Sequence, residues 1–277
     1  MKSVDNSVRR PWFWGAALLA FSLFTLLAEP LAAQSDGTIP GPTQFLPIVL
    51  NNGPEQPEPI VYDAVEVDNS GSCRADGRPA ADHGDLNLAL RGYEPADAVL
   101  DLVDYNGSTD ADAPQLPGLF GVGRLPPFVG AYQVYNWDWG CGPDGCRGAL
   151  LDEWPVTLVE LEAVSGEIVT IPSRGPRIDG AGHKALVLYA APTRLTLAYT
   201  RHDSAACGYI VHLEDLRVEP SLVSFYEELN RAGRVQLPGL DNGERLGTVA
   251  AAAIKVAVRD TGRFMDPRAR KDWWQGY

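Results

Sequence analysis

Apolar and polar residues alternate in several short segments, and this period of two constrains the fold more than any other feature of the sequence. Leu195, Leu197 and Tyr199 alternate with threonine and alanine, and the same alternation recurs in residues 209–213 and 254–258. Successive side chains of a β-strand point to opposite faces of its sheet, so the pattern is typical of half-buried strands. Further short segments bounded by Gly, Pro or Asp lie at residues 98–105, 132–139, 156–161 and 168–171. Residues 184–190 form a continuous apolar run, as expected of a strand covered on both faces. We therefore expect a mainly β protein, an antiparallel β-barrel or β-sandwich.

One segment departs from this pattern. After Pro220, apolar residues recur at the three- and four-residue spacing of a helix face, at Leu222, Phe225, Tyr226 and Leu229. We expect one amphipathic helix over about residues 220–232, packed on the sheet. Ser221 is expected to cap its first turn and Gly233 to end it.

The amino-terminal residues 1–33 have the features of an export signal. Arg9 and Arg10 precede an apolar stretch at residues 12–27, and Ala32 and Ala33 offer a small-residue cleavage site before Gln34. An uncleaved membrane anchor is the competing interpretation, because the apolar stretch approaches spanning length. Cleavage is favoured, and it leaves no integral membrane span in the mature chain.

The remaining sequence divides into a linker and a single domain. Residues 34–62 form a proline-rich linker, interrupted by the apolar segment 45–50. Strand patterns then dominate residues 63–277, so we expect one β-rich domain there.

Four cysteines fit an exported chain, because an oxidising compartment lets them pair. Cys141 and Cys146 enclose Gly-Pro-Asp-Gly, which is turn chemistry, so we expect them to pair with each other and Cys73 to pair with Cys207. Two other connectivities remain open at this point. A zinc site on the four thiols would lack a CxxC pair or a neighbouring histidine.

The chain has a net charge of -13 and a sequence pI near 4.7. A negative charge of this size repels nucleic acid, so a general nucleic-acid binder is excluded. A solvated acidic surface without a specific partner is the plainest interpretation of that charge. The acidity also suits the capture of cations outside the cell.

No catalytic motif is assembled along the chain. The four histidines, His83, His183, His202 and His212, form no HExxH, HxH or HxxxD arrangement, and no GxSxG nucleophile motif is present. His212 is the strongest of the weak catalytic candidates, because it stands in an expected strand two residues before Glu214. Asp260 is the third candidate. Surface or core roles are the more common explanation for lone histidines.

Oxygen-bearing side chains are concentrated in residues 104–112. Asp104, Asn106, Asp110 and Asp112 are weak calcium candidates, since Ca²⁺ prefers hard oxygen ligands. The same residue types occur in any surface turn, and the segment lacks the glycine and glutamate of an EF-hand loop. No other cofactor is expected.

Aromatic residues suggest a ligand platform at two places. Tyr135, Trp137 and Trp139 alternate along an expected strand, which would put them on one face as a platform for sugar rings. Trp273 and Trp274 lie among basic residues near the carboxyl end and are candidates to contact an anionic polymer. Core filling, or attachment of the terminus to the domain, is the alternative for these aromatic residues.

Three short motifs resemble lysostaphin-type (LytM-like) zinc endopeptidases of the bacterial wall. Residues 166–175 resemble an early strand and turn of their barrel, residues 240–247 a late turn, and residues 257–267 the closing strand with its Asp-Pro. The resemblance implies a β-barrel related to cell-wall peptidoglycan. The family binds zinc through HxxxD and HxH motifs, but residues 254–258 contain no histidine and His83 and Asp85 have the wrong spacing. A barrel without zinc would act as a binding or regulatory module.

These observations favour a secreted or cell-envelope-associated binding module without catalytic activity, whose ligand is a cell-wall polymer or polysaccharide. The alternative is an extracellular hydrolase of peptidoglycan or another glycan, with an acid–base pair that no motif reveals.

Overall fold

The computed structural model describes residues 59–277, which belong to one compact unit, Gln56–Tyr277. The expected export signal (residues 1–33) and most of the expected linker (residues 34–62), including the apolar segment 45–50, lie outside the described residues. The first strand begins at Asp63, where the β-rich domain was expected to start.

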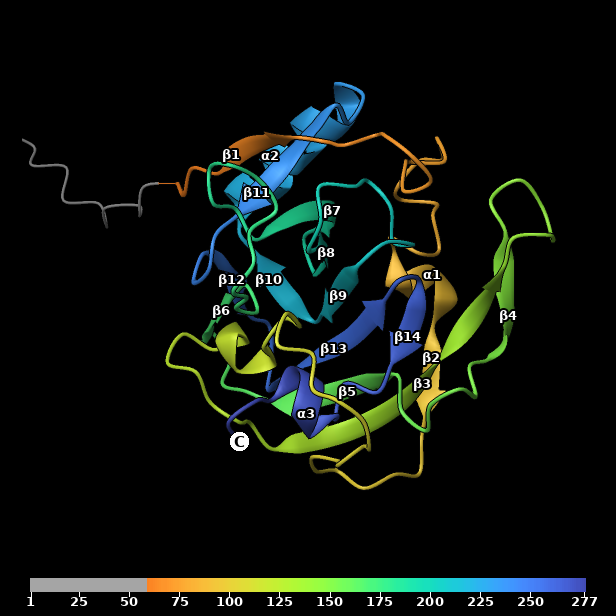
Figure 1. The fold of residues 1–277 in the computed structure, drawn as a ribbon, viewed down its shortest axis with the longest axis vertical. Helices are drawn as coiled ribbons and strands as arrows, with labels where there is room; N and C mark the ends of the chain where they lie inside the picture. Colours follow the sequence, from red (N-terminus) through yellow and green to blue (C-terminus); the bar gives the residue numbers. More distant parts are fainter. Residues whose placement is uncertain (1–58) are drawn as a thin grey trace, which may run out of the picture. The chain divides into compact units, whose positions relative to one another are not determined.

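The domain is mainly β, as the alternation predicts, and every strand pair is antiparallel (Figure 1). The large sheet has eleven strands, in the order β1 (Asp63–Glu66), β11 (Gln236–Leu240), β7 (Ala185–Ala191), β8 (Arg194–Ala198), β9 (Tyr209–Glu214), β13 (Ala253–Asp260), β5 (Leu158–Glu162), β3 (Phe128–Asp138) and β2 (Tyr93–Pro95). Two more strands flank this path: β14 (Arg263–Met265) pairs with β13, and β4 (Cys146–Leu150) pairs with β3.

A second, three-stranded sheet contains β10 (Leu216–Val218), β12 (Arg245–Val249) and β6 (Ile168–Thr170). Within residues 59–277 the strands do not close into a barrel, so a sandwich or open sheet describes the arrangement. Of the two architectures expected from the sequence, the barrel is therefore the wrong one.

The central strands are covered on both faces. Leu186, Val187 and Leu188 of β7 are fully buried, which explains why residues 185–190 are mostly apolar instead of alternating. The expected hairpin is also present, since β8 pairs with β9 through the turn that contains Asp203 and Cys207.

Helix α2 (Pro220–Arg231) confirms the expected amphipathic helix and packs against β7 and β11. The prediction that Ser221 caps it is wrong. Glu219 occupies the N-cap without a side-chain hydrogen bond, and the buried Ser221 hydroxyl has no partner within residues 59–277. Pro220 can occupy the first helical position because a backbone N–H there would have no partner in the helix. Gly233 follows the end of the helix at a φ of 97°, a conformation that glycine adopts without strain.

Three short helical segments complete the fold: α1 (Leu88–Arg91), η1 (Leu116–Leu119) and α3 (Arg270–Trp273). Among the described residues, no helix has both the length and the apolar character needed to cross a membrane.

Both expected disulfides are formed, Cys73–Cys207 and Cys141–Cys146. The first joins residues 134 positions apart in the sequence, and the second closes the tip of the β3–β4 hairpin. All four cysteines of the chain are therefore paired, as is typical of proteins from an oxidising compartment.

Candidate functional site

A pocket of about 740 Å³ lies where three segments meet beside the Cys73–Cys207 disulfide. Its first wall is the loop between β1 and α1, its second is the β8–β9 turn, and its third is the end of α2 with the residues that follow. Trp139, just beyond β3, closes the remaining side. Polar side chains dominate this lining: Asn69, Ser72, Arg74, Asp76, Arg78, His83, Asp85, Asp203, Ser204, Asn230 and Arg234.

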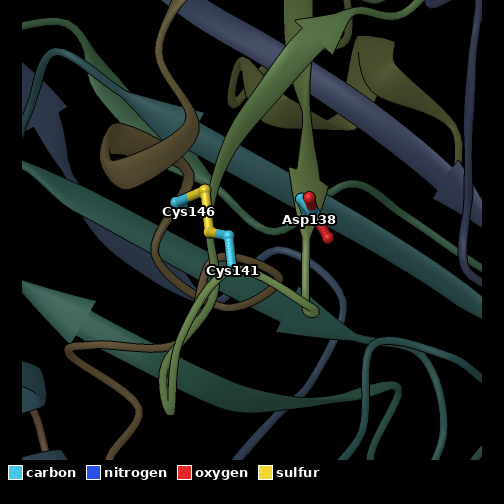
Figure 2. Close-up of side chains that lie close together, drawn as sticks. All are labelled: Asp138, Cys141 and Cys146. Carbon is cyan, nitrogen blue, oxygen red and sulfur yellow. A yellow bond between two sulfur atoms is a disulfide. The ribbon is translucent and has the colours of Figure 1, made fainter.

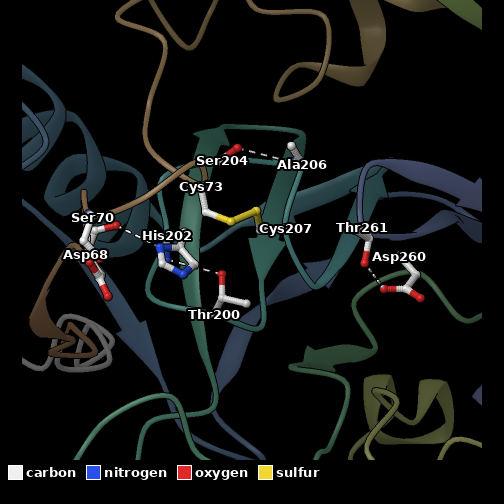
Figure 3. Close-up of a disulfide and its surroundings, with 10 residues drawn as sticks. All are labelled: Asp68, Ser70, Cys73, Thr200, His202, Ser204, Ala206, Cys207, Asp260 and Thr261. Carbon is white, nitrogen blue, oxygen red and sulfur yellow. Dashed lines mark hydrogen bonds between the residues drawn. A yellow bond between two sulfur atoms is a disulfide. The ribbon is translucent and has the colours of Figure 1, made fainter.

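The two disulfides hold the walls of this pocket. Cys73 stands in the first wall between Ser72 and Arg74, and its partner Cys207 directly follows the second wall (Figure 3). Within that second wall, Ser204 Oγ accepts a hydrogen bond from the Ala206 N–H at 3.2 Å. Cys141–Cys146 acts from the other side, because Arg78 Nε donates to the carbonyl of Pro143 inside that disulfide loop at 3.1 Å.

Trp139 provides the aromatic surface of the pocket, and its neighbours orient it. The guanidinium carbon of Arg78 lies 4.6 Å from the indole centroid, within cation–π range. The His83 ring meets the indole edge-on at 4.8 Å, and Trp137 meets it edge-on at 6.2 Å. Trp139 remains half-exposed, so part of its surface is available to a ligand.

His83 uses both ring nitrogens in contacts within the protein. The backbone N–H of Asp85 donates to Nδ1 at 3.1 Å, so the neutral ring carries its proton on Nε2. Nε2 then donates to the Asp76 carboxylate at 3.2 Å. Burial lowers the pKa of His83, although the carboxylates of Asp76 and Asp85 oppose that effect. At neutral pH His83 therefore organises the pocket wall, with no free nitrogen to act as a base.

Beneath the lining, one carboxylate serves two buried guanidinium groups. Asp85 forms ion pairs with Arg91 and with Arg259, the latter at 2.9 Å, and both arginine side chains are almost completely buried. Burial by itself would raise the pKa of Asp85, but Arg259 and Arg91 lower it to about 2. Asp85 is therefore ionised at any physiological pH.

Phe264 packs against this charged group and against His212. The guanidinium carbons of Arg259 and Arg91 lie 4.8 and 5.2 Å from the Phe264 centroid. The His212 ring stacks on the same phenyl group at 5.9 Å. Each buried cation thus has an aromatic face to supplement its single shared carboxylate.

His212 is sealed in the core. The Thr196 hydroxyl donates to the carbonyl of Leu86 at 2.6 Å, so the His212 Nδ1–H donates to Thr196 Oγ1 at 2.9 Å. Burial, with Arg259 and Arg91 nearby, holds the pKa of His212 well below its usual value. The Nε2 acceptor has no partner among the described residues.

The three catalytic candidates do not form one site. Glu214 shares a face of β9 with His212, but both are buried, and burial raises the pKa of Glu214. Asp260 is aligned with Tyr209 in the β9–β13 pair, so these two side chains share a face of the sheet. Tyr209 is an odd number of residues from His212 in β9, so Asp260 and His212 lie on opposite faces. Its carboxylate accepts a hydrogen bond from the Thr261 hydroxyl (Figure 3).

The calcium candidates also remain apart. Asp104 pairs with Arg270 at 2.8 Å, while Asp110 accepts hydrogen bonds from the backbone of Asp112 and from Tyr209. Asn106 is exposed. Over residues 59–277, the carboxylates of Asp104, Asp110 and Asp112 do not converge into a group that could hold a metal ion.

The described residues bring together one trio with metal-ligand atoms, Asp138, Cys141 and Cys146 (Figure 2). Both sulfur atoms of this trio are bonded to each other. A disulfide does not offer the thiolate ligands that zinc requires, so this trio is no zinc site while the bond is intact.

The expected aromatic platforms are only partly present. The pairing of β3 with β4 shifts register between Tyr135 and Trp137, and Tyr135 contacts Arg147 and Glu94 instead of the pocket. Trp137 and Trp139 do lie together.

The prediction of a ligand-facing platform at the carboxyl end needs correction. Trp273 is 2% exposed and Trp274 is fully buried, and their indole N–H groups donate to the carbonyls of Asp266 and Pro267. Both side chains belong to the core and hold the carboxyl terminus against the domain. The basic residues around them are used in the same way, since Arg268 pairs with the buried Asp266.

Sequence reasoning did not identify the first two pocket walls as a site. Their residues follow no regular pattern, and Asp76, Arg78 and Asp203 acquire their partners only in the fold. One signal was available: the expected Cys73–Cys207 bond already required the two loops to meet.

Comparison of the chain with protein-family models, with curated proteins and with solved structures finds no match.

Proposed function

We propose that this protein is an exported, non-catalytic binding module whose disulfide-walled pocket takes a saccharide segment of a cell-wall polymer or other polysaccharide. The pocket volume of about 740 Å³ falls in the range of sites for small ligands, roughly 300–1,000 Å³. That space accommodates a few sugar rings of a longer chain.

The observation that carries the proposal is the combination of Trp139 with planar polar side chains around it. A sugar ring presents apolar C–H faces and hydroxyl groups at its edge. The half-exposed indole of Trp139 can stack on the C–H faces of the ring. The carboxylate, amide and guanidinium groups of Asp76, Asn69 and Arg74 are suitable hydrogen-bond partners for the hydroxyl groups.

The fixed walls support the same function. Two disulfides and the Arg78 contacts to Asp76 and Trp139 hold the lining before any ligand arrives. Side chains that are already ordered lose little conformational entropy on binding, which favours affinity for a polar ligand.

Calorimetric titration of the exported, oxidised protein tests the proposal. The probes are soluble peptidoglycan fragments and defined oligosaccharides of both neutral and acidic composition. We expect binding in the millimolar to micromolar range, weakened about tenfold by Trp139→Ala, because removing one stacked aromatic side chain costs on the order of 1–3 kcal/mol. The control is Trp154→Ala, which removes a half-exposed indole that packs on Tyr105 and does not line the pocket.

Two results would overturn the proposal. One is the absence of binding across the panel, and the other is equal affinity of the wild type and Trp139→Ala. The titrated samples are also analysed for shortened oligosaccharides, which tests the hydrolase alternative. New reducing ends would show that the protein hydrolyses the oligosaccharide.

Export is tested by sequencing the amino terminus of the protein recovered outside the producing cell. We expect the mature chain to begin at Gln34, after the small residues that end the apolar stretch. A full-length chain in the membrane fraction would instead show that the segment is kept as an anchor.

A further inference from the structure

We infer that the saccharide bound in this pocket is acidic, with a ring carboxylate of the uronic acid type that pairs with Arg74. The inference rests on the proposed function and adds the chemical class of the ligand. It follows from the local balance of charge, from the partners of each guanidinium group and from the contrast with the rest of the molecule.

The pocket and the ion pairs directly beneath it carry an excess of positive charge. The lining holds three guanidinium groups and three carboxylates, and the two arginines buried beneath it bring the total to five guanidinium groups against three carboxylates, while burial keeps His83 neutral at pH 7. The cations are Arg74, Arg78, Arg91, Arg234 and Arg259, and the anions are Asp76, Asp85 and Asp203.

Four of the five guanidinium groups are already engaged. Arg78 pairs with Asp76, and the two buried arginines share Asp85. Arg234 donates to both oxygens of Asp203, and also to Tyr226, Asn230 and the carbonyl of Leu188. These groups shape the pocket and leave little donor capacity for a ligand.

Arg74 is different. It is exposed, it lines the pocket, and within the described part of the chain it has no ion pair or hydrogen bond from its side chain. Its neighbour Cys73 is held by the disulfide, so its backbone position is defined. A planar guanidinium with free donors matches the two oxygens of a carboxylate in a bidentate pair.

The local excess of positive charge at the pocket contrasts with the charge of the whole chain. The whole chain carries a net charge of -13, so its long-range field repels anions. A positive pocket on such a molecule selects by contact inside the site instead of attracting anions from a distance. Inside the site, a sugar carboxylate beside a stackable ring can meet Arg74 and Trp139 together, whereas a bare phosphate can meet only the charge of Arg74.

The test compares trigalacturonate with its fully methyl-esterified form, which keeps the size and the rings but removes the charge. Inorganic phosphate is the third probe and reports any affinity for an anion without a sugar. Titrations use the full oxidised protein at low salt. The variants are Arg74→Gln and Arg177→Gln, the latter removing an exposed arginine that lies outside the pocket.

We expect the acid to bind about tenfold more tightly than the ester, since a charge-assisted hydrogen bond contributes on the order of 1.5–3 kcal/mol. Arg74→Gln should remove most of that preference, because it should weaken binding of the acid much more than binding of the ester, while Arg177→Gln should change neither. Equal binding of acid and ester would overturn the inference but leave the proposed saccharide site intact. Tighter binding of phosphate than of the sugar acid would also overturn it. If neither oligosaccharide binds, nor any member of the wider panel, both proposals fall.

Discussion

His83 Nε2 donates a hydrogen bond to the Asp76 carboxylate across 3.2 Å, and this contact joins the aromatic side of the pocket to its first wall. In the neutral ring the opposite nitrogen, Nδ1, accepts from the backbone N–H of Asp85, and protonation of the ring removes that acceptor. The pair therefore connects the protonation state of one histidine to the shape of the candidate site.

This connection predicts a loss of stability in mild acid. Burial lowers the pKa of His83 in the folded state, so its contribution is fully present above the unfolded-state pKa near 6.5 and is lost as the pH falls through the lower folded value. We expect the free energy of unfolding, measured with urea, to fall as the pH drops below 6.5. In His83→Gln that fall should be smaller, because the amide has the same donor and acceptor and does not titrate.

The comparison of variants isolates His83 from the other histidines. His212, whose pKa is also lowered, adds a loss of the same sign, and His183, whose pKa is raised by Asp179 against the effect of burial, contributes the opposite sign. These contributions are common to the wild type and to His83→Gln. An identical pH dependence in the two proteins would contradict the role assigned to His83.

Removing the Asp85 carboxylate should be costly. Asp85→Asn leaves Arg91 and Arg259 buried with no counter-ion, and breaking a buried ion pair in this way costs about 3–5 kcal/mol. The same substitution at exposed Asp82 is the control, with an expected change within about 0.5 kcal/mol. Thermal and urea unfolding measure both, and a small effect at Asp85 would show that water reaches the two guanidinium groups.

The lowered pKa of Asp85 also predicts how the stability of the protein changes at very low pH. Its pKa of about 2 in the folded state lies below the ordinary value of 3.8, so its stabilising contribution is present above pH 3.8 and is lost as the pH falls toward 2. Asp85→Asn lacks this titration, and its unfolding free energy should therefore vary less than that of the wild type over that interval.

The two disulfides should differ in their effect on stability. In the chain-entropy picture, a loop of 134 residues corresponds to roughly 5 kcal/mol and one of 5 residues to about 2 kcal/mol. The double variant Cys73→Ser/Cys207→Ser should accordingly unfold at much lower urea than Cys141→Ser/Cys146→Ser. If the first wall is held as described, the former should also weaken oligosaccharide binding under conditions where it remains folded.

Gly84 is expected to tolerate no side chain. A Cβ at this position would overlap the indole of Trp137, although the backbone conformation itself is open to other residues. Gly84→Ala should destabilise the protein by about 1–3 kcal/mol, and Gly121→Ala, where nothing lies within 4 Å, should not. The double variant Gly84→Ala/Trp137→Ala tests the cause, because its loss should be smaller than the sum of the two single losses.

Much of the architecture could be predicted from local patterns in the sequence. The alternation at Leu195 and Leu197 reflects strand geometry, which puts both side chains on one face of β8, although Thr196 on the other face is buried too. The spacing of Leu222 and Tyr226 reflects a helix that covers the sheet. The disulfide between Cys141 and Cys146 follows from a short turn. Each of these signals lies within about ten residues, where sequence and structure are closely coupled.

The remaining features depend on contacts between distant segments. The burial of Trp273 and Trp274 comes from packing against parts of the chain more than 100 residues away, such as Phe128, and no local pattern reports it. Arg78 meets Trp139 only because two loops converge. Ser221 suits an N-cap in isolation, but the helix begins at Pro220, two residues earlier than that role requires.

The pairing of β1 with β11 has a consequence for the order in which the protein can assemble. Asp63 and its neighbours align with residues 236–239, so the first strand of the domain has no partner until nearly the whole domain has been synthesised. Until then its backbone donors and acceptors are satisfied by water. Long-range antiparallel pairing of this kind slows folding, since a large loop must close before any contact compensates for it. Assembly of the sheet edge is thus a late kinetic event, and a chain truncated before β11 would present β1 as an unpaired strand prone to self-association.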